Sequence, residues 1–420
     1  MKRRSFIKGV AAAGAATLLP AGAVAPLLNS CRTARPASGW NFDEVIDRSG
    51  TWSIKYGRSG KERFAMWIAD MDFRTDPVVK RALQERLDRD VMGYTSTPEE
   101  FYEAIRAWEG KQHSWNIPRE WLGYAPGVIT AINQAYLTFT RPGDKIIVQP
   151  PVYDHFRLYA ERLGREVVDN PLLFENGRYR MDFEGLERLF DEKTKLLVLC
   201  NPHNPCGILW DRETLIKLAE ICEKHGVLVV SDEIHADLAL YGQTHIPFCS
   251  VSDAAARIGL IFGGPTKAFN LAGISGTAFC VIPDKEKREK YMGTLRAAKL
   301  DDPSIPSLIS TIAAYTSESG WLTSLKSYLE GNIDMLMEFF SENETGIAPI
   351  RPQASFLVWL DCRKLGLPQD SLMALFRDKA GVYLSNGASY GAGGDGFVRL
   401  NVGCPRSVLR AALNHIYEMN

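Results

Sequence analysis

Short apolar runs alternate with amphipathic segments through the middle of the chain. Nearly continuous apolar side chains occupy residues 144–149, 195–200, 227–231 and 260–263. Such runs are typical of strands that are buried on both faces of a sheet. Apolar side chains recur at helical spacing over residues 77–88, 98–111, 127–140 and 215–225. Strands that alternate with helices in this way predict a mainly parallel sheet, and therefore an α/β fold.

Polar side chains follow the second, third and fourth of these runs. They are Asn204, Asp232 and Lys267. In parallel sheets the functional groups lie in loops at the carboxyl ends of the strands. We therefore expect these three side chains to face one site.

The pattern changes after about residue 290. Helical segments at 307–317 and 322–341 precede two strand-like runs at 355–360 and 396–401, which suggest a hairpin. This region is predicted to be a smaller α+β domain that packs with the N-terminal segment. The predicted organisation is a signal at 1–31, an N-terminal segment at 40–85, a large domain at 86–290 and a small domain at 291–420.

The first 31 residues differ from the rest. A basic start with Arg3 and Arg4 precedes an uncharged run, rich in alanine and glycine, from Gly9 to Leu28. The run is weakly apolar and contains two prolines, which argues against a permanent membrane span. The segment resembles a twin-arginine export signal, which serves proteins that have already folded.

Two motifs leave the cleavage point open. Residues 28–31 resemble a lipoprotein cleavage box that ends in Cys31, whereas residues 23–25 suit ordinary cleavage. The first would anchor the protein to a membrane through lipid on Cys31. The second would release it as a periplasmic protein.

Composition mainly excludes other classes of function. The 420 residues are 45% hydrophobic and 24% charged, with a formal net charge of -1. A chain without a basic excess is not expected to bind nucleic acid. Its cysteines and histidines lack metal-ligand spacing, so no metal site is expected. The seven cysteines after Cys31 are expected to be buried free thiols.

Three short blocks surround the polar residues at the strand ends. They are 201–207 (NPHNPCG), 231–235 (SDEIH) and 265–273 (PTKAFNLAG). Their order and spacing resemble the signature of the class I/II aminotransferase superfamily, which comprises fold type I enzymes that use pyridoxal 5'-phosphate (PLP). The resemblance runs from about residue 40 to the C-terminus. It implies a PLP cofactor, with a large α/β domain of mainly parallel sheet and a smaller α+β domain.

Further segments resemble a narrower branch, the cystathionine β-lyases or C–S lyases. These segments are 42–43, 47–48, 67–73, 93–94, 151–154, 231–235 and 396–406. Members of this branch act on a small amino-acid substrate.

The resemblance gives the main charged residues their roles. Lys267 would carry PLP as a Schiff base, because only lysine supplies the amine that the aldehyde requires. Asp232 would keep the ring nitrogen protonated, since a nearby carboxylate raises the pKa of that nitrogen; the alternative is a helix N-cap. Arg399 would hold the substrate carboxylate with its planar guanidinium. A lone arginine in a strand is otherwise explained by an ion pair on the strand face.

Further residues would contact the ring. Asn204 would donate to its phenolic oxygen, unless it serves only the Asn-Pro turn. His235 lies where a tyrosine often reaches the same oxygen, and a structural histidine explains it almost as well. Tyr153 would stack on the ring and complete the catalytic set with Lys267 and Asp232; the alternative is core packing.

The phosphate would bind at the start of the helix at 127–140. Backbone N–H groups of Val128 and Ile129 would donate to it, and Thr266 would add a hydroxyl. Tyr94 resembles a residue that reaches the phosphate from the neighbouring subunit. We therefore expect a homodimer with a shared active site.

Three positions depart from the family pattern. Gly264 stands where a hydroxyl side chain is usual, so one phosphate contact is expected to be missing. Cys206 replaces a small hydroxyl residue, and Tyr56 replaces a tryptophan that is common there.

The expected reaction is carbon–sulfur β-elimination from cystathionine or a cysteine-type amino acid, which gives pyruvate, ammonia and a thiol. It is favoured because the terminal segments resemble the lyase branch. An aminotransferase with the same core residues is the alternative. A PLP-binding regulatory module without catalysis is a third interpretation, against which the retained Lys267, Asp232 and Arg399 argue.

Overall fold

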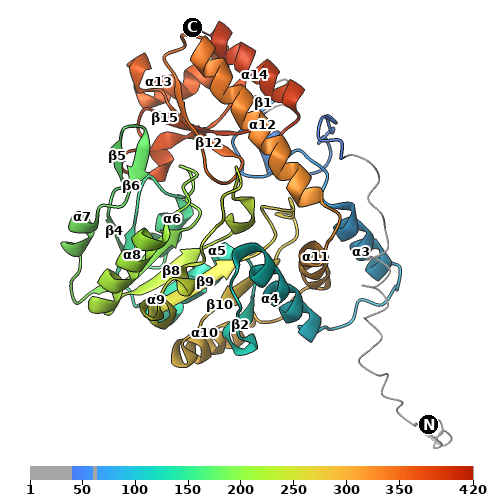
Figure 1. Cartoon of the computed structure of the whole chain (residues 1–420), viewed down its shortest axis with the longest axis vertical. Helices are drawn as coiled ribbons and strands as arrows, with labels where there is room; N and C mark the ends of the chain where they lie inside the picture. Colours follow the sequence, from blue (N-terminus) through green and yellow to red (C-terminus); the bar gives the residue numbers. More distant parts are fainter. Residues whose placement is uncertain (1–39, 60–63, 420) are drawn as a thin grey trace, which may run out of the picture.

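The computed structural model describes residues 40–59 and 64–419. The predicted export signal, the two cleavage motifs and Cys31 lie outside the described residues. Figure 1 shows a large sheet with its helices, drawn mainly in green and yellow, below a smaller sheet drawn in orange and red. The blue N-terminal segment runs beside the smaller sheet.

The large sheet has seven strands in the order β2-β10-β9-β8-β7-β3-β4. All neighbours pair in parallel except at β10, which is antiparallel to both β2 and β9. The strands are β2 (Leu122–Ala125), β3 (Lys145–Val148), β4 (Glu166–Asp169), β7 (Thr194–Cys200), β8 (Leu228–Asp232), β9 (Gly259–Gly263) and β10 (Ala278–Val281). The mainly parallel sheet predicted from the apolar runs is therefore confirmed.

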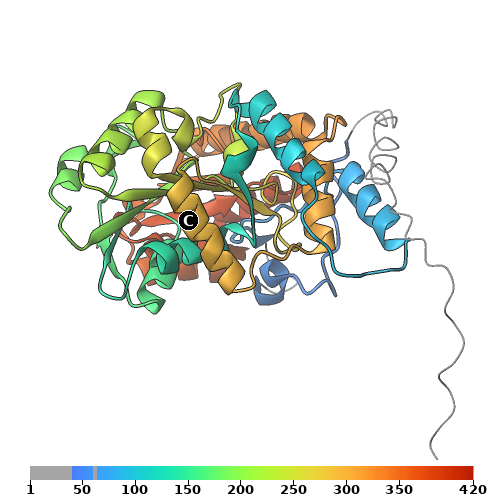
Figure 2. The same ribbon diagram turned by 90° about the horizontal axis from the view of Figure 1, so that it is seen from below.

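Apolar side chains on the central strands point alternately to the two faces of the sheet, which explains why helices cover both faces. On β7, Leu196 and Val198 belong to one apolar core, while Leu197 and Leu199 belong to the other. Successive side chains of a strand point to opposite faces, so an apolar run needs a helical layer on each side. Figure 2 shows these helices above and below the sheet.

The helices divide between the two faces. One core includes residues of α5 (Val128–Phe139), α6 (His155–Arg162) and α10 (Lys285–Ala297). The other includes residues of α4 (Glu99–His113), α8 (Arg212–Lys224), α9 (Asp253–Ile258) and α11 (Ile305–Tyr315). Short α7 (Phe183–Glu187) and the hairpin of β5 (Leu173–Glu175) and β6 (Arg178–Arg180) lie between β4 and β7 in the chain.

The smaller sheet is antiparallel, in the order β11-β12-β15-β14. Its strands are β11 (Ala348–Ile350), β12 (Leu357–Asp361), β14 (Ser385–Asn386) and β15 (Phe397–Asn401). The predicted strands near 355–360 and 396–401 do pair with each other. They do not form a simple hairpin, because α13 (Gln369–Ala374), a π-helical turn (Leu375–Lys379), β13 (Val382–Tyr383) and β14 intervene.

The N-terminal segment is attached to this smaller unit by backbone hydrogen bonds. Strand β1 (Phe64–Ala65) pairs in parallel with β13. The Asp72 N–H donates to the Gly403 carbonyl at 2.7 Å. The remaining helices are α2 (Ile54–Ser59), α3 (Pro77–Leu87), α12 (Trp321–Glu342) and α14 (Arg406–Glu418).

One helix begins earlier than its apolar pattern predicts. Helix α8 starts at Arg212, three residues before the expected 215. The carboxylate of Asp211 accepts from the Thr214 N–H at 2.7 Å and caps the first turn. The cap therefore determines this boundary, and apolar spacing alone misses it. Among the described residues, no helix has both the length and the apolar character that a membrane span requires.

Candidate active site

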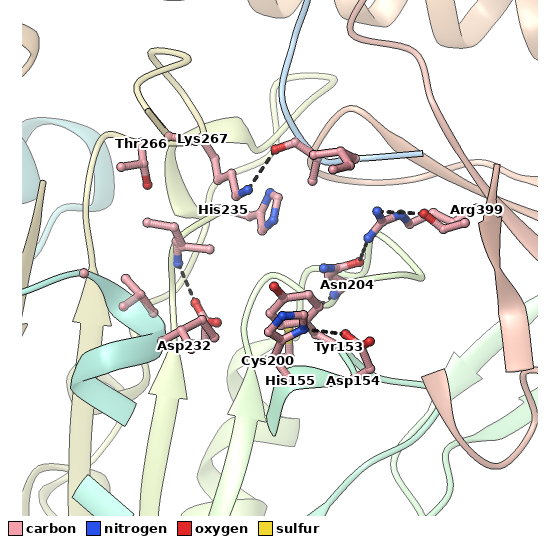
Figure 3. Close-up of a pocket in the computed structure, with 18 of the residues that line it drawn as sticks. Tyr153, Asp154, His155, Cys200, Asn204, Asp232, His235, Thr266, Lys267 and Arg399 are labelled. Carbon is pink, nitrogen blue, oxygen red and sulfur yellow. Dashed lines mark hydrogen bonds and ion pairs between the residues drawn. The ribbon is translucent and has the colours of Figure 1, made fainter. Parts of the chain in front are cut away.

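A pocket of about 820 Å³ lies at the carboxyl ends of the parallel strands. Its walls come from the large sheet, from the segment before α3 and from the smaller sheet (Figure 3). Every residue that the sequence predicted for the site lines this pocket except Tyr94. The lining residues from that set are Val128, Ile129, Tyr153, Asn204, Asp232, His235, Thr266, Lys267 and Arg399.

Lys267 extends from the turn after β9 into the pocket. Its Nζ donates to the Ala69 carbonyl at 2.8 Å, as the dashed line in Figure 3 shows. Burial, together with the positive charge of Arg399, lowers the pKa of this amine to about 8; nearby carboxylates of Asp70 and Asp232 oppose the change. The amine is therefore neutral near physiological pH far more often than that of an exposed lysine.

Asp232 is the last residue of β8. Burial raises the pKa of its carboxyl to about 7, although the N–H of Ile234 and the charge of Lys267 oppose this change. The Ile234 N–H donates to Oδ1 at 3.1 Å, and no helix begins at Asp232, so the N-cap alternative is wrong. A buried carboxylate of this kind is stabilised by a cation close to it.

Arg399 lies on β15 and is 4% exposed. One Nη donates to the Asn204 side-chain oxygen at 2.9 Å, and the other donates to the Trp67 carbonyl at 2.7 Å and to Ser385 Oγ at 3.1 Å. Its Nε has no hydrogen-bond partner in the part of the chain that the structure describes. Because all these acceptors are neutral, the strand-face ion pair considered for Arg399 is not formed. The site holds a buried guanidinium that is suited to an anion from outside the chain.

Asn204 and Tyr153 lie on the wall between Arg399 and the sheet. The Tyr153 N–H donates to the Asn204 carbonyl at 3.1 Å. The Tyr153 ring stacks on His155, with centroids 4.7 Å apart and planes 6° apart, and His155 Nδ1 is 2.8 Å from Asp154 Oδ1. Tyr153 is half-buried and lines the pocket, so it does more than fill the core. The sequence reasoning did not single out His155 or Asp154.

His235 is buried at the back of the pocket. Its Nδ1 has no partner among the described residues. Burial and the positive charges of Lys267 and Arg399 lower the pKa of its imidazole well below the usual range. His235 is therefore neutral at physiological pH and can present one N–H donor or one acceptor to a ligand.

The N-terminus of helix α5 faces the pocket. Gly127 precedes its first turn with a φ of 107°, a conformation that favours glycine. The first N–H groups of a helix lack intrahelical partners, so Val128 and Ile129 can donate to an anion. Thr266, Ser275 and Thr277 also line the pocket with hydroxyl groups, of which only Thr266 was predicted.

The backbone around Gly264 explains one departure from the family pattern. A Cβ at this position would lie 2.4 Å from the Thr277 carbonyl oxygen and 3.0 Å from the Ala278 Cα. This backbone therefore has no room for the hydroxyl residue that is usual there. Cys206, the second departure, is buried and does not line the pocket.

An ion-pair cluster fixes the segment that contacts Lys267. The carboxylate of Asp72 accepts from Lys55 Nζ at 2.9 Å, from Tyr56 OH at 2.9 Å and from Arg48 at 3.0 Å. Lys55 is only 1% exposed. Tyr56, the third departure, thus helps to hold residues 67–73 beside the pocket. The backbone contacts of Trp67 and Ala69 with Arg399 and Lys267 were not foreseen, because carbonyl groups leave no trace in the side-chain pattern.

Tyr94 lies away from this pocket. It is fully exposed in the loop between α3 and α4. Leu87, Val91 and Met92 near it are also exposed apolar residues. The single chain therefore does not bring Tyr94 to the site. In the described part of the chain, no cluster of three or more His, Cys, Asp or Glu is suited to a metal ion.

Comparison with known proteins extends this picture. Residues 1–20 match the model of the twin-arginine translocation signal, which confirms the predicted export signal. The chain is 42% identical to cystathionine beta-lyase PatB of Bacillus subtilis, over 90% of this chain and 98% of that protein. It is 33% identical to protein MalY of Escherichia coli, over 88% and 96% of the two chains.

Solved structures agree with the fold. A PLP-bound protein of Clostridium difficile superposes with a TM-score of 0.88 at 38% identity and covers 91% of this chain and all of that one. Cystalysin of Treponema denticola, which contains pyridoxal 5'-phosphate, gives a TM-score of 0.87 at 30% identity, covering 91% and 98% of the two chains. Residues 67–416 match the family model for aminotransferase class I and II, and the chain belongs to that family.

Proposed function

We propose that this protein is a PLP-dependent carbon–sulfur β-lyase that cleaves cystathionine or a cysteine-type amino acid to pyruvate, ammonia and a thiol. The observation that carries the proposal is one pocket that holds Lys267, Asp232 and Arg399, with no carboxylate paired to Arg399 in the described part of the chain. The 42% identity to a cystathionine beta-lyase over nearly its whole length favours a lyase.

The residues of the pocket fit PLP. Lys267 offers an amine with a lowered pKa for the aldehyde, and the buried carboxyl of Asp232 offers a partner for a protonated ring nitrogen. The open start of α5 and the hydroxyl of Thr266 offer donors for a phosphate. His235 Nδ1 and Arg399 Nε are buried polar atoms that lack partners among the described residues, as expected where a ligand completes the site.

PLP, when bound, supplies an electron sink for the bond that breaks at the substrate Cα. The chain itself supplies orientation and proton transfer. Arg399 would hold the α-carboxylate of the substrate through two parallel hydrogen bonds, so that the Cα–H bond faces Lys267. Its neutral partners Asn204, Trp67 and Ser385 position the guanidinium without neutralising its charge.

Lys267 would act as the base that removes the Cα proton. Its pKa of about 8 lies close to operating pH, which suits both taking and returning a proton. Asp232 would hold a proton on the ring nitrogen, and Tyr153 would flank the ring. Elimination then requires a thiolate leaving group on Cβ, which cystathionine and S-substituted cysteines provide.

We also infer that the working unit is a homodimer. Tyr94 would reach the phosphate of the neighbouring subunit, which is compatible with its full exposure in the single chain. The exposed side chains of Leu87, Val91 and Met92 beside it would be covered in the same contact. Exposed apolar groups of this kind are a reason to expect a partner surface.

The final location depends on the cleavage point. Cleavage after residue 25 would give a periplasmic protein, whereas cleavage before Cys31 would give a lipid-anchored one. Mass spectrometry of the mature N-terminus distinguishes the two, because acylated Cys31 adds the mass of its lipid chains.

A substrate assay without a keto-acid acceptor tests the proposed function. The purified holoenzyme is supplied with L-cystathionine, and pyruvate is followed over many turnovers. Sustained release of pyruvate supports the lyase. No pyruvate, with release of a single equivalent of the keto acid of cystathionine that resumes only when a keto-acid acceptor is added, would instead identify an aminotransferase, the alternative favoured by 25% identity to arginine–pyruvate transaminase AruH of Pseudomonas aeruginosa.

A further inference from the structure

Residues 67–73, here called the strap, contact both charged ends of the main pocket. The Trp67 carbonyl accepts from an Arg399 Nη at 2.7 Å, and the Ala69 carbonyl accepts from Lys267 Nζ at 2.8 Å. Arg399 lies on β15 of the smaller sheet, whereas Lys267 follows β9 of the large sheet. The strap therefore touches both of the residues on which the proposed reaction depends.

Side chains hold the carbonyl groups of the strap. Five successive carbonyls, from residue 67 to residue 71, each accept a hydrogen bond from a side chain. The Ile68 and Asp70 carbonyls share one donor group, the Nδ2 of Asn401, at 2.6 Å and 2.7 Å. These two carbonyls lie on either side of the Ala69 carbonyl in the chain. Asn401 therefore holds the peptide groups on both sides of that acceptor.

Asn401 is buried behind the pocket. It is 1% exposed and ends β15, two residues after Arg399. Side chains two residues apart on a strand point to the same face, so both reach the strap. The Asn401 Oδ1 accepts from the Gly403 N–H at 2.7 Å, so both ends of its amide are used by backbone groups. Asn401 does not line the pocket, and it can affect a bound molecule only through the residues that it holds.

A second asparagine holds the other end of the strap. Asn270 lies three residues after Lys267, and its Oδ1 accepts from the Met71 N–H at 3.0 Å. Its Nδ2 donates to the Met71 and Phe73 carbonyls, each at 2.9 Å. Lys267 and Arg399 are thus each followed in the chain by an asparagine that binds the strap. This arrangement ties the positions of the two charged side chains to one another.

Loss of the Asn401 amide would free the middle of the strap. The Ile68 carbonyl would lose the donor that the structure shows for it, and a buried carbonyl without a donor is unfavourable. The peptide groups around Ala69 could then rotate, and the Ala69 carbonyl would turn away from Lys267. A displacement of about 1 Å in a reacting group can reduce a rate about 100-fold.

We propose that Asn401 is a positioning residue for the β-elimination, which acts through the strap to fix the Lys267 amine in relation to the Arg399 guanidinium. The inference rests on the proposed β-lyase function and adds to it a residue outside the pocket. When the substrate is held at Arg399 by its α-carboxylate, the strap sets where the Lys267 amine meets the proton on Cα. The Ala69 carbonyl restricts the direction of this amine.

Steady-state kinetics of the holoenzyme with L-cystathionine test this role. Asn401→Ala should lower kcat and raise KM, and kcat/KM should fall about 100-fold. Loss of folded protein alone would lower the apparent kcat and leave KM unchanged. The matched control is Asn332→Ala, because Asn332 is 0% exposed and its Nδ2 also donates to two backbone carbonyls, those of Val402 and Cys404, at 2.9 Å each. This control should show a similar fall in melting temperature and keep the kcat and KM of wild type.

Hydrogen exchange of the cofactor-free protein gives a readout that does not depend on activity. Backbone N–H groups of the strap should exchange faster in Asn401→Ala than in Asn332→Ala. Asn270→Gly is a second variant, which keeps the test decisive if Asn401→Ala fails to fold. Glycine adopts the φ of 56° found at Asn270 without strain, and this variant should lower kcat/KM about tenfold or more.

The outcomes separate the positioning role from the proposed function. Equal kcat/KM values for Asn401→Ala and Asn332→Ala, or equal exchange of the strap in the two variants, would overturn the positioning role. Wild-type kinetics in Asn270→Gly would do the same. A wild-type protein that releases no pyruvate from L-cystathionine would instead refute the proposed function.

Discussion

Buried charges at the level of single residues indicate what the pocket binds. Asp232 and Arg399 are 5% and 4% exposed, and neither has an opposite charge in direct contact in the described part of the chain. An uncompensated charge in such a place destabilises a folded protein. The residues are therefore explained better by a ligand with matching charges than by stability of the empty chain.

The pKa of Asp232 leads to a prediction about stability in the cofactor-free protein. Its carboxyl has a pKa of about 7 when folded and about 3.9 when unfolded. The folded state therefore binds more protons between these values, and the contribution of Asp232 to the free energy of unfolding falls as pH rises from 4 to 7. Asp232→Asn removes this loss. The advantage of the variant over wild type should grow by about 1–3 kcal/mol between pH 4.5 and pH 7.5.

Denaturant unfolding at the two pH values measures this difference. With PLP bound the sign should reverse, because the variant lacks the partner for a protonated ring nitrogen and should bind PLP more weakly. Asp395→Asn, at an exposed carboxylate outside the pocket, is the control and should show neither change. An advantage of Asp232→Asn that is independent of pH would contradict the burial of an ionisable carboxyl.

At the level of elements, the pattern of apolar and polar side chains predicted several strands and the site residues that follow them. The apolar runs predicted the parallel strands β3, β7, β8 and β9, and the residues that follow three of them, Asn204, Asp232 and Lys267, line one pocket. Short strands and backbone hydrogen bonds could not be predicted from the same pattern. Strands β2, β4 and β10 were not predicted, because each has only four residues, too few for an apolar pattern to distinguish a strand from a loop. The Ala69 carbonyl that accepts from Lys267 was missed because any residue carries a carbonyl.

Gly264 illustrates an element-level constraint that can be tested. Any Cβ there meets the backbone of Thr277 and Ala278, which a rotamer change cannot relieve. Gly264→Ser should lower the free energy of unfolding by about 1–3 kcal/mol because it overpacks the turn before Lys267. Thermal unfolding of the holoenzyme measures the loss. Gly273→Ser is the matched control, since a Cβ at Gly273 meets nothing within 4 Å. Equal melting temperatures of the two variants would show that the turn can relax.

At the scale of the whole molecule, Tyr94 can contact the cofactor only if two subunits share each active site, because it lies away from the pocket of its own chain. A Lys267→Ala subunit retains Tyr94, and a Tyr94→Ala subunit retains Lys267. A dimer of one of each would contain one complete site if Tyr94 serves the neighbouring subunit. Refolding the two inactive variants together should therefore restore about a quarter of wild-type activity, because about half of the dimers are mixed and each has one intact site.

Steady-state release of pyruvate from the co-refolded mixture measures this restoration. Refolding each variant alone is the control, and neither should regain activity. If Tyr94 acted on the pocket of its own chain, the mixture would be as inactive as its components.

The central claim is that the amine of Lys267 holds the cofactor opposite the carboxyl of Asp232. Its most direct test is borohydride reduction of the holoenzyme, followed by mass spectrometry of its peptides. The visible absorbance should disappear and the peptide containing Lys267 should gain the mass of reduced PLP, while the Lys267→Ala protein should show neither change. Modification of a different lysine, or retention of the absorbance band in Lys267→Ala, would contradict it.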